Sequence, residues 1–224
     1  MHESRSALRE PPAGGFAGTF HALAREMGHD MLSMLRATRP VPDPDELDDP
    51  AVVRAAAGEQ AAARALVETY GQRVFALVSR MLAGRDRAVI EDVAQDTFCD
   101  VFRKLRGWRP GGPARLSTWI LTIAARRAID ELRRKRPEPI AMPEAVGTGR
   151  ADDATRRRDV VAAIERGLAE LSPELRAAFL LREYHELEYA EIASALAIDL
   201  GTVKSRLSRA RAALRVALAE VRDE

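Results

Sequence analysis

The chain has 224 residues, and its 35 Lys and Arg residues against 34 Asp and Glu residues leave a formal net charge of only +1, which excludes a uniformly basic nucleic-acid coat. A single cysteine, Cys99, excludes an intramolecular disulfide and a multi-cysteine zinc site, and it is typical of a reducing cytoplasm. No apolar run approaches the roughly 18 residues that span a bilayer, so we expect a cytoplasmic protein without membrane insertion.

The composition favours helices throughout. Ala, Leu and Arg recur and runs of β-branched residues are almost absent, which predicts an all-α protein. Near the N-terminus, six apolar residues recur at steps of three and four and so share one face of a predicted helix. These residues are Phe16, Phe20, Leu23, Met27, Met31 and Met34.

Two breaks in composition divide the chain. Residues 39–50 hold four prolines and five acidic residues, which predicts a solvated acidic linker. Residues 137–153 combine proline and glycine without an apolar period, which predicts a flexible tether. The expected organisation is an N-terminal extension over 1–50, a small helical domain over 51–136, a linker over 137–158 and a second small helical domain over 159–224.

Apolar residues recur at helical spacing through most of both predicted domains. The first domain is expected to hold three main helices and one short one, over about 59–82, 86–105, 117–136 and 51–57. Ser117 or Thr118 is the expected N-cap of the third. The second domain is expected to hold helices over 160–171, from Pro173 to about Tyr184, 189–196 and 200–216, with Ser172 as a cap. Only three residues separate the last two helices, so they are predicted to form a helix-turn-helix.

The last predicted helix has one apolar face and one basic face. The apolar residues are Val203, Leu207, Ala210 and Leu214. Five basic residues and no acidic one lie between Leu200 and Arg215. Arg and Lys on a helix after a tight turn suit the DNA major groove, whereas the alternative is a solvated basic face on a helical bundle. The short preceding helix and turn favour DNA binding.

The third helix of the first domain ends in six basic residues against two acidic ones. The helix dipole favours cations at that end, but six exceed what the dipole needs. Trp108 lies in the Gly- and Pro-rich loop over 107–116 and Trp119 follows it, and aromatic groups beside a basic surface suit unstacked single-stranded bases. Trp119 falls on the apolar stripe and is expected in the core, while Trp108 is freer.

The second helix carries like charges along one face, at Asp92, Asp96 and Asp100, which only Lys104 is expected to relieve. Such a stripe indicates a divalent metal, a basic partner surface or a merely solvated face. No second cluster of Asp, Glu or His accompanies it, so a partner is favoured over a metal. No phosphate loop or nucleophile motif is present either. We therefore expect no catalysis, no metal and no cofactor.

Four segments together resemble the extracytoplasmic-function (ECF) sigma factors, a group within the sigma-70 family of bacterial RNA polymerase subunits. VIEDVAQDTFCDVFRKL (89–105) and LSTWILTIAARRAIDELRRKR (116–136) resemble sigma domain two. LSPELRAAFLLREY (171–184) and YAEIASALAIDLGTVKSRLSRARAAL (189–214) resemble sigma domain four. A helix-turn-helix alone is common, but both blocks in this order across a tether are specific to the family.

The resemblance implies a role for three sets of residues. Core-polymerase contacts fall on Glu91, Asp92, Gln95 and Asp96. Capture and melting of the downstream promoter element fall on the loop before Trp119 and on Trp119, Arg126, Arg127, Arg133 and Arg134. The upstream element is read through Thr202, Lys204, Ser205, Ser208 and Arg209, with Arg206 and Arg211 on phosphates. The implied partners are core RNA polymerase, promoter DNA and an anti-sigma factor or another antagonist.

Three positions depart from the family pattern: Val89 replaces an Asp, Arg126 replaces an Asn and Ala197 replaces the turn glycine. The main rival interpretation is a polymerase-independent regulator that uses the same helix-turn-helix. That interpretation leaves the acidic stripe and the basic helix of the first domain without a role. An enzyme with an aspartate-rich metal site is a more distant alternative.

Overall fold

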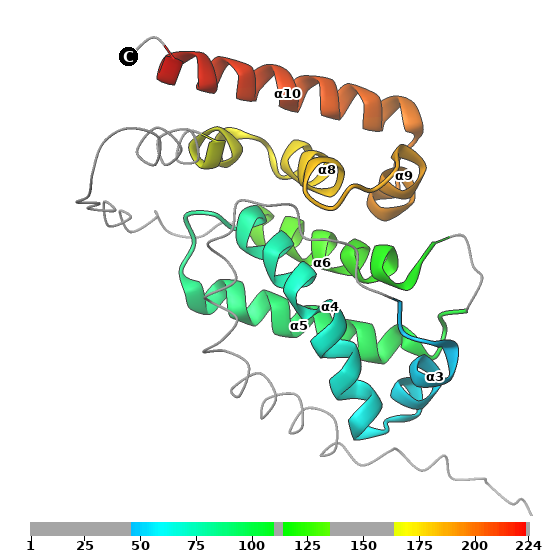
Figure 1. Ribbon diagram of the computed structural model, residues 1–224. Coiled ribbons are helices and arrows are strands. Elements are labelled where there is room, and N and C mark those ends of the chain that lie inside the picture. Colours follow the sequence, from blue (N-terminus) through cyan, green and yellow to red (C-terminus); the bar gives the residue numbers. More distant parts are fainter. Residues whose placement is uncertain (1–45, 110–113, 135–163, 223–224) are drawn as a thin grey trace, which may run out of the picture.

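The computed structural model describes residues 46–109, 114–134 and 164–222, and within these residues every regular element is a helix (Figure 1). This confirms the all-α prediction. The helices are α3 (Asp49–Ala57), α4 (Gln60–Met81), α5 (Arg87–Leu105), α6 (Leu116–Arg133), α8 (Pro173–Glu183), α9 (Tyr189–Leu196) and α10 (Leu200–Arg222), and residues 164–170 are also helical. The amphipathic helix predicted over 16–34 and the tether over 137–153 lie outside the described residues.

Short-range caps explain where several helices begin and end. The Asp48 carboxylate accepts a hydrogen bond from the Ala51 amide at 2.8 Å, which starts α3, and Gly58 ends α3 at a φ of 95°. The Ser172 side chain accepts from the Leu175 amide, which confirms its predicted role as the cap of α8. The last helix continues past the expected end at Val216, because Ala, Leu and Glu are good helix formers.

The start of α6 differs from the prediction. The N-cap position belongs to Arg115, which makes no side-chain cap bond, and Ser117 and Thr118 are buried inside the first turn. A distant carboxylate does the capping instead. Glu46 Oε1 accepts from the Ser117 amide at 3.2 Å and from its hydroxyl at 2.7 Å, which places a negative charge at the positive end of the helix.

The same carboxylate corrects the expectation of a solvated linker over 39–50, as far as that segment is described. The Tyr70 hydroxyl of α4 donates to Glu46 Oε2 at 3.0 Å and accepts from the Leu47 amide at 3.2 Å. Asp48 is the N-cap of α3, and that helix already begins at Asp49. Glu46 and Leu47 are therefore half-buried and bonded to α4 and α6, whereas residues 48–50 are exposed, as the prediction of a solvated segment expects.

Helix α4 is the centre of the molecule and α6 is its middle layer. α4 contacts α3, α5, α6 and α8, and most of its side chains from Leu66 to Met81 are buried. α6 packs on α4 and α5 through one face and on α8 and α9 through another, as Figure 1 shows. One hydrophobic cluster runs from Val52 through these layers to Leu214, so the helix-turn-helix rests on α6.

Buried cations line the contact between α4 and the C-terminal helices. Arg176 of α8 is 5% exposed, and its Nη1 donates to the Met81 carbonyl at the end of α4 at 2.6 Å. Arg73 of α4 is 3% exposed, and its Nη2 donates to the His185 carbonyl at 3.1 Å. Each guanidinium thus meets a main-chain oxygen from the other half of the molecule, which limits the cost of burying its charge.

Candidate nucleic-acid interface

The helix-turn-helix is formed by α9 and α10 with a sharp turn between them. Ala197 ends α9 in the left-handed region at a φ of 54°, which redirects the chain within one residue. Asp199 then caps α10, since its carboxylate accepts from the Thr202 amide at 2.8 Å and from the Thr202 hydroxyl. These bonds hold the pKa of Asp199 below its ordinary value. The turn therefore fixes the direction of α10 relative to α9.

The two faces of α10 lie as the sequence predicts. Val203, Leu207, Ala210 and Leu214 are all buried. On the opposite side Lys204, Ser205, Ser208 and Arg209 are exposed, while Thr202, Arg206 and Arg211 are half-buried.

Several residues of this face already have hydrogen-bond partners within the chain. The Thr202 hydroxyl is held by the Asp199 cap, and the Arg211 guanidinium donates to Glu183 Oε1 of α8 at 2.7 and 3.1 Å. That hydrogen bond raises the pKa of Arg211. Ser205 and Arg209 make bonds only within α10: the Ser205 hydroxyl donates to the Thr202 carbonyl at 3.0 Å, and the Arg209 guanidinium donates to the Ser205 carbonyl and hydroxyl at 3.4 Å. Lys204, Ser205 and Arg209 are all exposed and so remain accessible to DNA.

The basic residues of α6 make contacts within the chain. Arg127 Nε donates to Asp100 Oδ2 of α5 at 2.5 Å, and its Nη1 lies 3.4 Å from Asp96 Oδ2. The bond to Arg127 lowers the pKa of Asp100 and raises the pKa of Arg127. The prediction that only Lys104 relieves the aspartate stripe is therefore wrong, because Asp100 is buried and ion-paired across the α5–α6 contact.

Three further arginines of α6 also have partners. Arg126 Nε donates to the Ala195 carbonyl of α9 at 3.1 Å, and Arg133 Nη2 lies 2.6 Å from Glu174 Oε1 of α8. The bond from Arg133 holds the pKa of Glu174 below its ordinary value. Arg134 pairs with the buried Glu131 at 3.2 Å. Trp119 is half-buried against the core, as its position on the apolar stripe indicates.

The acidic residues that remain on the surface of α5 lie in its first half. Asp92 and Asp96 are exposed, while Glu91 and Gln95 are half-buried. Glu91 accepts from Arg87 Nε at 2.6 Å one turn earlier on the same helix. Val89, at the departure from the family pattern, is half-buried and packs against the core. This surface is negative at Asp92 and Asp96 and is available to a basic partner.

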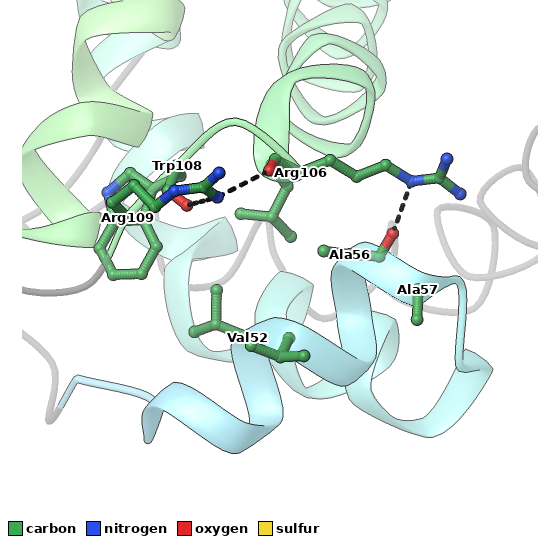
Figure 2. A pocket seen from close by; sticks show the side chains of 8 residues that line it. Val52, Ala56, Ala57, Arg106, Trp108 and Arg109 are labelled. Atoms are coloured by element: carbon green, nitrogen blue, oxygen red, sulfur yellow. Dashed lines mark hydrogen bonds between the residues drawn. The ribbon is translucent and has the colours of Figure 1, made fainter.

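A pocket of about 510 Å³ lies beside Trp108, between α3 and the end of α5 (Figure 2). Val52, Ala56 and Leu105 give it apolar walls, and the lining residues include Arg106 and Arg109. Arg106 Nε donates to the Ala56 carbonyl at 3.1 Å, and Arg109 Nη1 donates to the Arg106 carbonyl at 3.2 Å. An aromatic ring between apolar walls and guanidinium groups suits a flat, partly anionic ligand.

Two other kinds of site were searched for within the described residues. No group of three or more His, Cys, Asp or Glu side chains there is placed to hold a metal ion. Among those same residues, no helix combines the length and apolar character needed to cross a membrane.

Comparison with known proteins places both halves of the chain in one family. The model of sigma-70 region 2 matches residues 66–138, and the model of sigma-70 region 4 matches residues 162–214. The ECF RNA polymerase sigma factor SigE of Mycolicibacterium smegmatis is 34% identical over 178 residues, which cover 75% of this chain and 67% of SigE. The chain belongs to the ECF sigma factors of the sigma-70 family. It is therefore a sigma factor, a protein that directs promoter-specific transcription by RNA polymerase.

Further relatives agree with this assignment. The RNA polymerase sigma-H factor of Pseudomonas aeruginosa is 30% identical to this sigma factor over 186 residues, which cover 77% of this chain and 94% of the relative. The structure of CnrH in complex with the cytosolic domain of CnrY matches with a TM-score of 0.56 and 25% identity, over 76% of this chain and 96% of CnrH. The sigma factor RpoE from Bartonella quintana, in a co-crystal structure with the anti-sigma factor NepR, shares the fold with a TM-score of 0.53, at 20% identity over 70% and 96% of the two chains.

The structure of this sigma factor adds residues that the sequence analysis missed. Glu46 joins the N-terminal side of the chain to α4 and α6, and Arg73, Arg176 and His185 form the buried contact between α4 and the C-terminal helices. One signal was present: Arg176 lies four residues before Leu180 and next to Ala177, so helical spacing places it near the apolar face. Nothing in the sequence marked Glu46, because its partners are distant in the chain.

Proposed function

We propose that this sigma factor divides its work between two units, residues 51–136 and 159–224. The first unit binds core RNA polymerase through α5 and holds the melted downstream element on α6. The second reads the upstream element through α10. Two weak readers on one chain gain avidity when the promoter spacing lets both bind at once. The linker over 137–158 sets which spacings are allowed.

The polymerase contact is assigned to Glu91, Asp92, Gln95 and Asp96. Two observations support this assignment: Asp92 and Asp96 are exposed, and all four residues lie on the first half of α5. A negative surface steers the approach of a basic partner and fixes the register of docking. The half-buried position of Val89 explains why an aspartate is dispensable there, because its side chain packs against the core.

The downstream element is assigned to α6 and the pocket beside Trp108. Trp119, Arg126, Arg127, Arg133 and Arg134 lie along α6 and supply attraction for a phosphate backbone. The pocket of about 510 Å³ offers an indole ring and the guanidinium groups of Arg106 and Arg109 to one unstacked base. Base capture at this pocket would hold the strand open next to the basic helix.

The upstream element is assigned to α10, which enters the major groove. Lys204, Ser205, Ser208 and Arg209 are exposed and read base edges, with Thr202 beside them. Arg206 and Arg211 contact phosphates. Glu183 holds the Arg211 guanidinium in one position. A guanidinium held in this way suits a contact with the DNA phosphate backbone better than a contact with base edges.

An antagonist and a place of action in the cell are also part of the proposed function. Two structural neighbours are bound to other proteins, CnrH to the cytosolic domain of CnrY and RpoE to the anti-sigma factor NepR. We infer that an anti-sigma factor or another antagonist controls this chain as well. Core polymerase works in the cytoplasm, so the sigma factor acts there, and it supplies binding and strand separation rather than catalysis.

One observation carries the proposal: the chain exposes acidic residues on α5 and a basic face on α10, and these are different surfaces of one compact body. The test is promoter-specific transcription by purified core polymerase with the wild type and with Asp92→Lys/Asp96→Lys. We expect the variant to lose co-purification with core enzyme and transcription while it keeps its helix content, since exposed charges contribute little to stability.

The control variant Glu68→Lys/Glu165→Lys makes the same charge change at two other exposed positions. It should retain both activities. Undiminished polymerase binding by Asp92→Lys/Asp96→Lys would contradict the assignment to α5. Promoter binding without any stimulation of core polymerase would favour the rival interpretation, a polymerase-independent regulator.

A further inference from the structure

Helix α3 has apolar side chains on both of its sides. Its inner side is buried in the core, and of its nine residues only Asp49 and Arg54 are charged. On the outer side Pro50, Val53 and Ala57 are exposed, at a spacing that places them in one row along the helix. Val53 is one of three large apolar side chains that the described residues leave exposed. A helix that is apolar on every side is normally covered on every side, so this outer row of α3 is a surface that calls for a partner.

The outer row of α3 continues into the pocket beside Trp108. Val53 and Ala57 belong to both, because they also line the pocket. Figure 2 shows α3 on one side of the pocket and Trp108 with Arg109 on the other. A volume of about 510 Å³ suits a drug-sized ligand, so one unstacked base leaves part of the pocket empty. The unfilled part on the α3 side is apolar.

The chain itself carries a segment whose character matches this surface. The helix predicted over 16–34 has an apolar face of Phe, Leu and Met residues, and Met side chains adapt to irregular surfaces. A helix over these residues is about 28 Å long, about twice the length of α3. Its apolar face is therefore long enough to cover both the outer row of α3 and the open side of the pocket.

Charges beside the two apolar surfaces are complementary. Helical spacing places Glu26 and Asp30 one turn apart at one edge of the predicted apolar face, whereas Arg25 falls on the opposite side. Next to the outer row of α3, Arg54 is exposed, and so is Arg106, whose Nε donates to a carbonyl of α3 at 3.1 Å. Acidic groups at the edge of the segment thus meet cations when the apolar surfaces come together.

The connection to the described part of the chain keeps the segment close to α3. Glu46 and Leu47 are bonded to α4 and α6, and Asp48 caps α3. The stretch from Met34 to Glu46 spans at most about 40 Å when extended. A short tether of this kind gives an effective concentration of roughly millimolar order, so even a weak contact is occupied.

We propose that residues 16–34 dock on the outer row of α3 and form an additional wall of the pocket beside Trp108. The apolar face of the segment fills the α3 side of the pocket, while Trp108, Arg106 and Arg109 remain for the unstacked base. The role of the wall rests on the proposed function of the pocket. A more enclosed pocket buries more of the base, so the segment strengthens base capture.

The first test measures how accessible position 53 is to a thiol reagent. A Cys99→Ser background carries either Val53→Cys or the matched control Val216→Cys, since the two valines are 62% and 65% exposed among the described residues. Figure 1 shows α10, which carries Val216, on the far side of the molecule from α3. The measurement is the rate of alkylation in the full chain.

Substitutions in the segment then show whether it protects position 53. Phe20→Asp/Met27→Asp disrupts the apolar face, and we expect it to raise the rate at position 53 by about tenfold or more without changing the rate at position 216. Ala22→Asp/Leu32→Asp adds the same charges on the other side of the predicted helix. It should leave both rates unchanged.

The second test identifies what covers the outer row of α3. Met27→Cys is combined with Val53→Cys, or with Val216→Cys as the control, in the Cys99→Ser background, and a short thiol-specific crosslinker is added. We expect a crosslink within one chain that forms about tenfold or more faster for the pair with position 53. A crosslink between two chains would overturn the proposal and assign the surface to a second copy.

The third test measures the wall of the pocket. Fluorescence anisotropy of a labelled single-stranded oligonucleotide of random sequence is recorded with complexes of core polymerase and each segment variant. We expect Phe20→Asp/Met27→Asp to bind about fivefold more weakly than the wild type and Ala22→Asp/Leu32→Asp to match it.

Unchanged alkylation at position 53 in Phe20→Asp/Met27→Asp would overturn the docking, and equal or tighter single-strand binding by that variant would overturn the wall. A failure of the proposed function looks different. The wild-type complex would then hold no single strand, while alkylation and crosslinking would still report the docked segment.

Discussion

At the scale of single residues, Ala197 shows how a local departure from a family pattern is accommodated. Alanine stands where the family pattern has the turn glycine, and the structure places Ala197 at φ 54° and ψ 50°. A Cβ in the left-handed region costs about 1–2 kcal/mol, part of which the more restricted unfolded chain offsets. The turn keeps its shape because α9 and α10 are both packed against the core on either side of it.

Ala197→Gly should therefore stabilise the protein by about 1 kcal/mol, since glycine adopts this conformation freely. Urea denaturation followed by circular dichroism measures the change. Ala193→Gly, in the interior of the same helix, is the matched control and should instead lower the free energy of unfolding by about 1 kcal/mol. Equal effects of the two substitutions would show that Ala197 is unstrained.

His185 makes stability depend on pH. It is 4% exposed, neither ring nitrogen has a hydrogen-bond partner among the described residues, and burial followed by the charges of Arg73 and Arg80 lowers its pKa to about 3. In the unfolded chain His185 has the ordinary histidine pKa of 6.5 and binds a proton below that pH, whereas in the folded protein the imidazole stays neutral down to about pH 3. Stability is therefore fully present above pH 6.5 and falls as the pH decreases from 6.5 towards 3.

The expected loss is about 1.4 kcal/mol for each pH unit below 6.5. Asp100 and Glu174, whose pKa values are lowered by Arg127 and Arg133, lose their stabilising charge only in more acidic solution, so the two effects separate. Urea denaturation between about pH 7.5 and pH 5.5 measures the slope, and His185→Leu should flatten it. An unchanged slope in His185→Leu would mean that another group takes up the proton.

At the scale of the helices, the sequence predicts several helix boundaries correctly because caps and apolar spacing are local features. The predicted range 189–196 coincides with α9, and the predicted start at Pro173 coincides with that of α8, since apolar spacing and a Ser-Pro cap define both. The cap of α6 was wrong because its partner Glu46 lies 71 residues earlier in the chain. For the same reason, the Asp92, Asp96 and Asp100 series was recognised but the pairing of Asp100 with Arg127 was not.

Glu46 should matter for the packing of α6 on α4. Glu46→Ala leaves the buried Ser117 amide and hydroxyl, together with the Tyr70 hydroxyl, short of a partner, and we expect a loss of about 1–3 kcal/mol in the free energy of unfolding. Denaturation by urea checks this value. Asp49→Ala, an exposed acidic residue in the first turn of α3, should cost well under 1 kcal/mol.

Two of the arginines on α10, Arg209 and Arg211, should behave differently. Arg209→Ala removes an exposed base-edge contact and should cost about 1–3 kcal/mol of discrimination between the upstream element and random DNA. Arg211→Ala removes a phosphate contact, so it should weaken both complexes alike and reduce the salt dependence by about one counterion. Titrations of the two DNA duplexes at several salt concentrations measure both effects. Equal behaviour of the two variants would mean that the register of α10 in the groove is different.

At the scale of the whole molecule, the sequence predicts two units on a tether but not the contact between them, in which α4 packs on α8 and α6 packs on α8 and α9. Several residues of this contact are charged or polar, and most such residues in a sequence lie on the surface. Arg73, Arg176 and His185 are nevertheless buried, because each places a polar group opposite a main-chain carbonyl or supplies that carbonyl itself. Contacts of this kind depend on how two helical layers meet, which local periodicity does not encode.

The contact between the two units and the predicted tether should have separate effects, which cutting the chain after it has folded can distinguish. With a specific protease site inserted into the predicted tether over 137–153, we expect the two fragments to remain together on gel filtration. α6 packs on α8 and α9 and carries the Arg133–Glu174 pair, and Arg73 and Arg176 donate to carbonyl groups across the contact between α4 and the C-terminal helices. The same cleavage should reduce transcription with core polymerase by about a hundredfold or more, because the units that bind the upstream and downstream elements no longer share one chain. Uncut protein with the inserted site is the control. Fragments that separate at once would show that the tether alone joins the two units, whereas full transcription after cleavage would show that polymerase and the contact between the units hold both units without it.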